Sequence, residues 1–440
     1  TDLADAFEVP LATILEDNQI SGRQPVAGSL LFLRNPVLNE EEPYAPMWTD
    51  ETINILPYQG DVKGTDYAYG HVNLAKGSLY YTDTDVEIKE QSTYSLSRIF
   101  HSQTTNIRGL FGYGISSILD TKLVELDENT LLAYLEDGRG ILFTKNGEAY
   151  IDETEEMTLT VSDTEFRMKN YAGEYWVFDT LGNLTEAGTK KGKSFSLEYN
   201  EEKKLEKMVT RAEKEYKFTL DKKGRITSME KPDERVRYYT YDQKGLLSTV
   251  TNERGYHTTY TYDSGKRLKK VTNPMGKDTL LLGYASNGAV ISYKDGEGAE
   301  STFSYSGNNT VYIDGNKNKT IYTANALGQH ETVTYSDGST EKRTFDKKGN
   351  ILTDTDKAGL TTTYTYDSKN NMLTKTEPSD ITLKYTYDDS CNLLTETDAN
   401  GNVISYIPAN GTDTKLIVTF DGEVLSYISS SGAASEYDLY

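Results

Sequence analysis

Apolar and polar residues alternate along short segments throughout the second half of the chain. In the segment that ends at Asp263, Tyr260 and Tyr262 alternate with Thr259 and Thr261. Side chains of an extended strand point alternately to its two faces, so the tyrosines share one face and the threonines the other. Both residue types favour a half-buried, pleated surface. The alternation predicts β-strands with one aromatic face and one threonine face.

These alternating segments recur at a fixed distance along the chain. Equivalent positions lie 21 residues apart at 199, 220, 241 and 262, and again at 345, 366 and 387. A fixed period indicates one structural unit stacked on copies of itself. The residues that we assign to the structural repeat are Tyr241, Asp242, Gly245, Tyr262, Asp263, Phe345, Asp346, Gly349, Tyr366, Asp367, Tyr387 and Asp388.

Each part of the unit has a physical role. An aspartate at the end of a strand hydrogen-bonds its own backbone and starts a turn. Three residues later stands a glycine, at 182, 224, 245 and 349, which adopts a left-handed backbone at the least cost. Asn370 and Cys391 stand in its place in the last two regular units. A second glycine, such as Gly255 or Gly359, marks the return turn. We expect two strands of roughly seven residues per unit and a long, continuous antiparallel sheet. The period leaves open whether this sheet winds into a solenoid, a shell or a barrel.

The repeat loses its regularity in two places. Tyr284, Tyr305 and Tyr322 keep the aromatic residue but lose the aspartate, and their spacing slips. The chain also stops at Tyr437-Asp438, which is the opening of another unit. We therefore expect both ends to be truncations of a longer protein.

The chain begins with a segment of a different kind. Leu3, Phe7, Leu11 and Ile14 fall at helical spacing, and a short apolar run follows at 29–33. The pattern resembles the last three elements of a LysM module, a family that binds glycans containing N-acetylglucosamine. We assign residues 1–34 to a partial LysM-like module whose first strand is missing. The resemblance implies sugar contacts from a loop that contains Asn18, Gln19 and Ile20.

Three further segments complete the predicted organisation. Residues 35–64 are rich in proline and charge without periodicity and are typical of a linker. Residues 65–177 alternate between strands and turns, and they contain ordered blocks that begin at Gly70, Gly77, Leu96 and Gly109. Residues 178–440 are the repeat array.

The blocks of residues 65–177 and the repeated Tyr-Asp-x-x-Gly-x-Leu unit resemble the N-terminal portion of an Rhs/YD-repeat protein. That family includes bacterial wall-associated polymorphic toxins and the animal teneurins. The resemblance implies a mainly β fold, in which hairpins form a spiral sheet or hollow shell, with residues 65–177 as the leading β-segment before the repeats. Bacterial members enclose a C-terminal toxin. Neither a toxin nor a self-cleavage motif lies in these residues, so neither is carried over.

Composition and charge restrict the partners. The chain of 440 residues carries a net charge of −22, which argues against a nucleic-acid surface and against an anionic membrane surface. It contains 34 tyrosines, whose rings can be buried while their hydroxyls stay wet. No apolar run is long enough for a transmembrane helix. A single cysteine, Cys391, excludes a disulfide framework within the chain.

The sequence contains few features of a catalytic site or a metal-binding site. The four histidines, His71, His101, His257 and His330, do not show metal-ligand spacing. Carboxylates recur at one turn position, which is a row of capping groups, whereas a glycosidase needs two that face each other across a cleft. We predict no catalytic residue, no cofactor and no metal.

These inferences favour a non-enzymatic structural shell of an exported bacterial Rhs-type toxin, extracellular or associated with the cell wall. The shell would enclose and deliver a C-terminal toxin or other cargo absent from this chain, and the LysM-like module would anchor it to peptidoglycan or other glycans. The alternative is a cell-surface adhesin or glycan-binding repeat protein. A hydrolase that carries the repeats as a stalk would need a catalytic domain beyond residue 440.

Overall fold

The structure is a computed structural model that describes residues 64–152, 156–389, 391–408, 414–420, 423–428 and 434–436. The LysM-like segment and nearly all of the predicted linker lie outside these residues. The described part is almost entirely antiparallel β-structure, with one short 3-10 helix, η2 (Ile118–Asp120). The predicted fold class is confirmed.

The wall begins at Lys122, so the leading segment, as the name is used from here on, runs only from residue 64 to η2 and is shorter than the predicted 65–177. Its seven strands are β1 (Tyr67–Ala68), β2 (Val72–Asn73), β3 (Tyr80–Lys89), β4 (Thr93–His101), β5 (Arg108–Gly109), β6 (Gly112–Tyr113) and β7 (Ile115–Ser116). The first strands of the wall follow η2 and are β8 (Lys122–Asp127), β9 (Thr130–Tyr134), β10 (Gly140–Asn146), β11 (Ala149–Asp152), β12 (Met157–Val161), β13 (Phe166–Asn170), β14 (Tyr175–Phe178), β15 (Leu184–Thr189), β16 (Gly192–Tyr199), β17 (Leu205–Thr210) and β18 (Glu215–Leu220).

The wall continues through β19 (Ile226–Glu230), β20 (Val236–Tyr241), β21 (Leu247–Thr251), β22 (His257–Tyr262), β23 (Leu268–Thr272), β24 (Asp278–Tyr284), β25 (Val290–Asp295), β26 (Glu300–Ser306), β27 (Asn309–Ile313), β28 (Lys319–Ala324), β29 (His330–Thr334) and β30 (Thr340–Phe345). Its last strands are β31 (Ile351–Thr355), β32 (Thr361–Tyr366), β33 (Met372–Thr376), β34 (Thr382–Tyr387), β35 (Leu393–Thr397), β36 (Val403–Pro408), β37 (Thr414–Phe420), β38 (Glu423–Ile428) and β39 (Ala434–Glu436).

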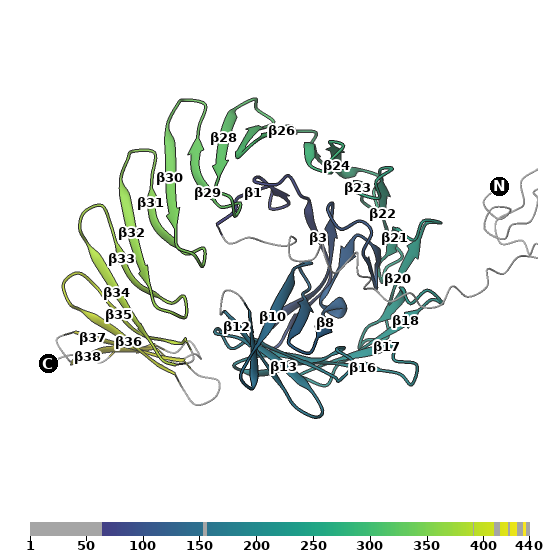
Figure 1. Ribbon diagram of the computed structural model, residues 1–440, viewed down its shortest axis with the longest axis horizontal. Helices are drawn as coiled ribbons and strands as arrows, with labels where there is room; N and C mark the ends of the chain where they lie inside the picture. The colour runs from purple at the N-terminus through teal and green to yellow at the C-terminus, as the bar shows by residue number, and fades with distance from the viewer. Residues whose placement is uncertain are drawn as a thin grey trace, which may run out of the picture.

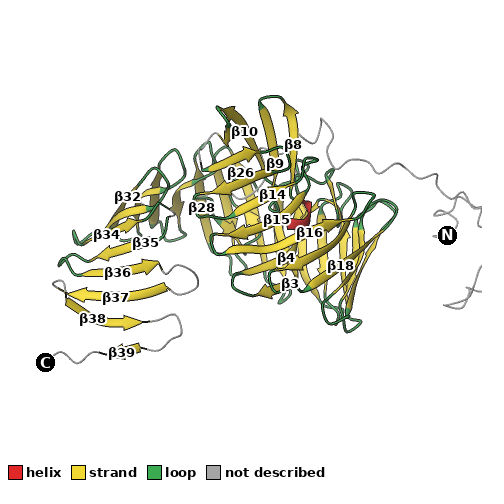
Figure 2. Cartoon of the chain, turned by 90° about the horizontal axis from the view of Figure 1, so that it is seen from below, coloured by secondary structure: helices red, strands yellow, loops and turns green. Residues whose placement is uncertain are grey.

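Strands β8 to β39 form one continuous sheet in which each strand pairs with the next along the chain. The sheet curves into a ring-like wall around the leading segment (Figure 1). After a turn of 90°, neighbouring strands of the wall are seen side by side, most plainly from β35 to β39 (Figure 2). The repeat therefore builds a wall that is one sheet thick, and the leading segment is an inner layer of it.

Later parts of the sheet contact its first strands and turns in two places. Leu123 N donates to Gly182 O at 2.9 Å, so β8 meets the turn before β15. Farther along, the side chains of Asn370 and Asn392, in turns between late repeat strands, hydrogen-bond to Glu156 and Lys190 near the start of the sheet. The late repeat units therefore lie next to the early ones in space, as expected for a sheet that winds into a spiral.

The repeat turns follow the predicted chemistry. In the turn after β20, Leu246 N donates to Asp242 Oδ1 at 2.8 Å, and Gly245 N donates to Asp242 O at 3.0 Å. Gly245 has φ +78°, and Asn370 and Cys391 in the same slot have φ +65° and +59°. The turns take up more of each unit than expected, so β19 to β23 have five or six residues instead of roughly seven.

In five repeat units the tyrosine at the end of a strand bonds that strand to the preceding unit. Its hydroxyl donates to the backbone carbonyl of the first residue of an earlier strand. The pairs are Tyr199 with Leu184 (2.8 Å), Tyr241 with Ile226 (2.6 Å), Tyr262 with Leu247 (2.9 Å), Tyr284 with Leu268 (2.5 Å) and Tyr305 with Val290 (2.9 Å). The tyrosine ladder is therefore packed into the wall, and its polar atoms are satisfied there.

We predict opposite stability effects for two substitutions at left-handed turn positions. Gly359 has φ +80° and open space where a Cβ would stand, so Gly359→Ala adds only backbone strain and should lower the free energy of unfolding by about 1–2 kcal/mol. Cys391→Gly relieves the same strain and should raise it by up to about 1 kcal/mol. Urea unfolding of the three proteins measures both changes. A shift of the same sign in both variants would contradict the assignment of these two turn positions to the left-handed region.

Candidate functional site

The inner face of the wall carries the leading segment, which crosses one repeat unit after another. Backbone hydrogen bonds join the two layers at intervals, and the start of the leading segment meets later repeat units than its end does. The pairs are His330 N with Gly64 O (3.0 Å), Val290 N with Gly77 O (2.8 Å), Tyr113 N with Gly245 O (3.4 Å) and Ile226 N with Leu110 O (2.8 Å). We call this two-layer region, formed by the leading segment and the inner face of β17 to β30, the lined face.

Close approach between the layers depends on glycine at two of these crossings. A Cβ on Gly77 would lie 2.7 Å from the ring of Tyr305 and 2.8 Å from Ala289 Cβ. A Cβ on Gly112 would lie 2.6 Å from Gly245 O. Because neither glycine carries a side chain, the leading segment can lie directly against the backbone and rings of the repeats.

A buried ion pair lies at the centre of the lined face. Arg98 of β4 is 1% exposed, and its Nε and Nη2 donate to the two carboxylate oxygens of Asp85 at 2.9 Å each. Its Nη1 donates to Tyr260 OH at 3.1 Å, and Nη2 lies 3.2 Å from Asp83 Oδ2. The guanidinium also lies 5.8 Å from the ring centre of Tyr239 and 5.5 Å from that of Tyr260. Bidentate pairing and aromatic rings are what a desolvated guanidinium needs.

The wall completes this charge cluster from its own strands. Arg237 of β20 donates to Asp85 Oδ1 at 2.6 Å and pairs with Glu253, which lies 2.9 Å from Lys231 Nζ. Tyr239 OH donates to Asp85 Oδ2 at 2.9 Å. The positive and negative charges of the cluster are therefore equal in number.

The ion pairs set the protonation of Asp85. Burial alone would raise its pKa, but Arg98 and then Arg237 hold the pKa of Asp85 below its ordinary value of 3.8. A carboxyl whose pKa is lowered by folding stabilises the fold fully above its ordinary value. That contribution is lost as the pH falls through the lowered pKa. We expect the cluster to weaken only in strong acid.

The local sequence explains how the hairpin presents these groups. β3 and β4 pair directly, and Arg98 stands opposite Asp83. The register shifts between Thr84 and Val86, so Asp85 lies in a bulge and reaches the same guanidinium as Asp83. Two aspartates at alternate positions and an arginine across the hairpin were a readable signal that the sequence analysis did not use.

A second anchor lies at the start of the leading segment. Asp66 N donates to His330 Nδ1 at 2.9 Å, and Arg343 Nη1 lies 3.3 Å from both Asp66 carboxylate oxygens. Burial would raise the pKa of Asp66, but His330 and Arg343 lower it overall. Tyr69 stacks on Tyr293 with ring centres 4.2 Å apart. Ion pairing and stacking thus fix the start of the inner layer to the wall.

The residues assigned to the repeat occupy two environments. Tyr241 and Tyr262 lie under the leading segment, and the ring of Phe345 lies beside Gly64. Tyr366 and Tyr387 lie on late strands and are half-buried. The repeat aspartates accept backbone N–H groups in their turns, through Asp242, Asp263, Asp346, Asp367 and Asp388. Gly245 and Gly349 have φ +78° and +79°. Asn18, Gln19 and Ile20 lie outside the described residues.

Late strands leave their aromatic face partly uncovered. Tyr239 and Tyr260, the first tyrosines of their pairs, are 2% and 3% exposed beneath the leading segment. Tyr364 and Tyr385 hold the same place in their units but are only half-buried. The leading segment follows the arc of the wall from β17 to β30 and not the strands from β32 onward (Figure 1). We call this second region, the inner face of β31 to β35, the open face.

The histidines and the cysteine have structural surroundings. His101 is buried and hydrogen-bonds Ser116 Oγ at 2.7 Å, and burial lowers its pKa to about 4. His257 is exposed on the threonine face and lies 2.8 Å from Thr251 Oγ1. Cys391 Sγ accepts a hydrogen bond from Asn371 at 3.4 Å.

Within the described ranges, no group of three or more histidine, cysteine or carboxylate side chains is placed to hold a metal. The same ranges contain no helix long and apolar enough to cross a membrane.

Comparisons with known proteins agree with the repeat architecture. The teneurin YD-shell family model matches residues 174–313, and the RHS repeat model matches residues 345–382. Each of these two matches covers part of the repeat array. A domain of unknown function, DUF6531, matches residues 69–143, which include most of the leading segment and the first wall strands. No curated protein matches the chain.

Several solved structures are similar in part to this chain. The crystal structure of TcdB2-TccC3-Cdc42 has 13% identity, a TM-score of 0.39 and coverage of 80% of this chain and 23% of that one. For TcdB2-TccC3 the values are 12%, 0.38, 81% and 24%. For the Photorhabdus luminescens Tc holotoxin pore they are 12%, 0.32, 83% and 21%. This chain thus spans about a quarter of the length of these proteins or less.

We predict that Arg98 is the residue on which the lined face depends. Arg98→Met leaves Asp85 buried with one partner removed, and it should lower the free energy of unfolding by about 3–5 kcal/mol. Arg235→Met is the matched control, because Arg235 and Asp233 form an ion pair whose side chains are 54% and 50% exposed. The control should cost about 1 kcal/mol or less. Equal midpoints of denaturant unfolding for the two variants would contradict the prediction.

Proposed function

We propose that the chain is a non-catalytic wall segment of an exported bacterial toxin, a shell that encloses and delivers a C-terminal cargo. The observation that carries this proposal is the continuous sheet that curves round an inner layer and returns to its own start. A wall with every strand paired offers few free backbone edges to proteases and to other proteins. Its activity would be exclusion, with no bond made or broken.

The lined face and the open face would have different roles in such a shell. The lined face is filled by the chain's own leading segment and fixes the curvature of the wall. The open face presents half-buried rings, including Tyr364, Tyr366, Tyr385 and Tyr387, towards the interior. Tyrosine offers a broad apolar surface with a polar tip, which suits contact with an enclosed polypeptide whose own structure is not fixed. The net charge of −22 would favour a basic cargo.

The proposal predicts protection of the cargo. We expect a protease added to the complete gene product to leave the segment after the repeats intact, because the wall keeps the protease away from it. The same segment expressed alone should be cut quickly, and mass spectrometry of both digests measures the difference. A structure of the complete protein that shows an open, solvent-filled ribbon with no enclosed chain would overturn the proposal, as would equal rates of cleavage.

A second function, glycan binding, has one observation in its favour. The uncovered tyrosines of the open face are of the kind that stack on sugar rings. Anchoring to peptidoglycan is a further part of the main proposal, and it would use the LysM-like residues 1–34 with Asn18, Gln19 and Ile20.

One glycan array can separate these two uses of glycans. Anchoring predicts that the chain binds oligomers of N-acetylglucosamine and that Asn18→Ala with Gln19→Ala abolishes the binding. The adhesin alternative predicts binding that survives this change and is lost in Tyr364→Ala with Tyr385→Ala. A chain that binds no glycan would contradict both, while leaving the enclosing wall to the protection experiment.

A further inference from the structure

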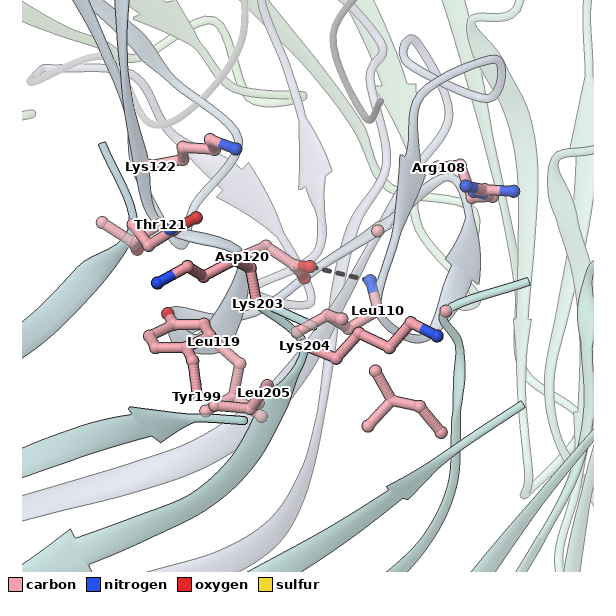
Figure 3. A pocket seen from close by; sticks show the side chains of 14 residues that line it. Arg108, Leu110, Leu119, Asp120, Thr121, Lys122, Tyr199, Lys203, Lys204 and Leu205 are labelled. Atoms are coloured by element: carbon pink, nitrogen blue, oxygen red, sulfur yellow. Dashed lines mark hydrogen bonds between the residues drawn. The ribbon is translucent and has the colours of Figure 1, made fainter. Parts of the chain in front are cut away.

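A small cavity lies between the end of the leading segment and a repeat turn. Its volume is about 120 Å³. Asp120 of η2, Thr121 and Lys122 line one side, and Lys203 and Lys204 of the turn between β16 and β17 line the other, with Arg108 nearby (Figure 3). The charged side chains at the cavity are therefore four bases and one acid, in a chain whose net charge is −22.

Two buried polar atoms at this cavity lack a hydrogen-bond partner. Asp120 is 3% exposed, and its Oδ1 accepts from Leu110 N at 2.7 Å. Its Oδ2 is buried without a partner, and so is Oγ1 of Thr121, which is 2% exposed. Buried polar atoms are nearly always hydrogen-bonded, so two unpartnered ones in residues that line one cavity indicate a missing group.

The protonation of Asp120 decides what kind of group fits. Burial raises its pKa to about 7, although hydrogen bonds with the backbone at Leu110 and Ser117 lower it in part. A protonated Asp120 carries its hydrogen on the unpartnered Oδ2, because Oδ1 already accepts from Leu110. Oδ2 and Thr121 Oγ1 are then both donors, and the neighbouring ammonium groups are donors as well. A cavity lined by these donors and by bases matches an oxyanion.

Lys203 brings a positive charge to the cavity from a turn position that glycine occupies in the units on either side. It has φ +62°, and Gly182 and Gly224 in the same slot have φ +78° and +76°. Its side chain lines the cavity, so this unit adds an ammonium group to the lining where its neighbours have none.

We propose that this cavity binds a tetrahedral oxyanion, a sulfate or phosphate group, through the ammonium groups of Lys122 and Lys203, the hydroxyl of Thr121 and the carboxyl of Asp120. Lys204 and Arg108 line the same cavity and add positive charge, and Lys204 also pairs with Glu202 at 2.8 Å. Binding needs the hydrogen on Asp120, because a carboxylate there would repel the anion. The site is therefore a proton-dependent anion site.

Other groups around Asp120 do not supply this pH dependence between about pH 6 and pH 8. The phenols of Tyr134 and Tyr241 interact with its charge, but burial raises the pKa of both well above their ordinary value. Arg108 stays charged. Burial lowers the pKa of Lys122 from 10.5, and its interaction with Asp179 opposes that change. Lys122 is thus the one other group whose titration needs a control.

Calorimetric titration of the chain with sulfate tests the proposal. Sulfate remains a dianion at both about pH 6 and about pH 8.5, so a change in its affinity reports the protein alone. We expect binding to be at least about tenfold tighter at the lower pH, since Asp120 loses its proton across this range. Asp120→Asn keeps a donor at the same place at every pH, and it should bind sulfate with little dependence on pH. If Lys122 were the titrating group, Asp120→Asn would keep the full dependence.

Lys203→Gly supplies the second arm, because glycine suits φ +62° and the variant should fold. It should bind sulfate at least about tenfold more weakly, as expected for loss of a charged hydrogen bond. Lys317→Gly is the matched control: Lys317 has φ +69° in an exposed turn and does not line the cavity. Glycerol phosphate in place of sulfate distinguishes a site for free anions from one that accepts a phosphate ester. No heat of binding at millimolar sulfate at the lower pH, or equal affinity in the wild type and Lys203→Gly, would overturn the proposal.

Discussion

The buried pair of Arg98 and Asp85 is the interaction on which the rest of the structure depends. A guanidinium and a carboxylate that are both withdrawn from water are stable only when every hydrogen bond of the pair is made. Part of the requirement is met within the β3–β4 hairpin, and the remainder comes from Arg237, Tyr239 and Tyr260 of the wall. Neither layer satisfies these charges alone, so the ion pair makes the inner layer and the wall one folding unit.

The same requirement constrains the curvature of the wall. A sheet of equivalent hairpins has no intrinsic reason to stop curving at one radius. Here backbone hydrogen bonds, which leave little freedom, join the leading segment to the wall at fixed places from Gly64 at β29 to Leu110 at β19. Glycines 77 and 112 bring the layers to their closest approach. The length of the inner layer therefore sets how many units can share it and how tightly they turn.

The sequence was sufficient for everything that repeats. The turn begun by Asp242, the left-handed slot held by Gly245 or Cys391, and the division into tyrosine and threonine faces all follow from local chemistry, and the structure contains each of them. The position of the inner layer could not be predicted from the sequence, for a physical reason. Arg98 and Tyr260 are 162 residues apart, and no periodic pattern links them. The Asp120 cavity is a similar case, because it joins η2 to a turn that sequence alone would treat like any other.

The choice of tyrosine explains how one repeat can serve both regions of the inner face. Beneath the leading segment, Tyr239 and Tyr260 are almost fully buried, and their hydroxyls bind Asp85 and Arg98. On the open face, Tyr364 and Tyr385 keep the same place in the unit while still partly in contact with water. A leucine would be costly in the second setting, and a serine would add little packing in the first. A wall built of tyrosine can therefore be lined along one arc and left open along the next, without any change in the unit that builds it.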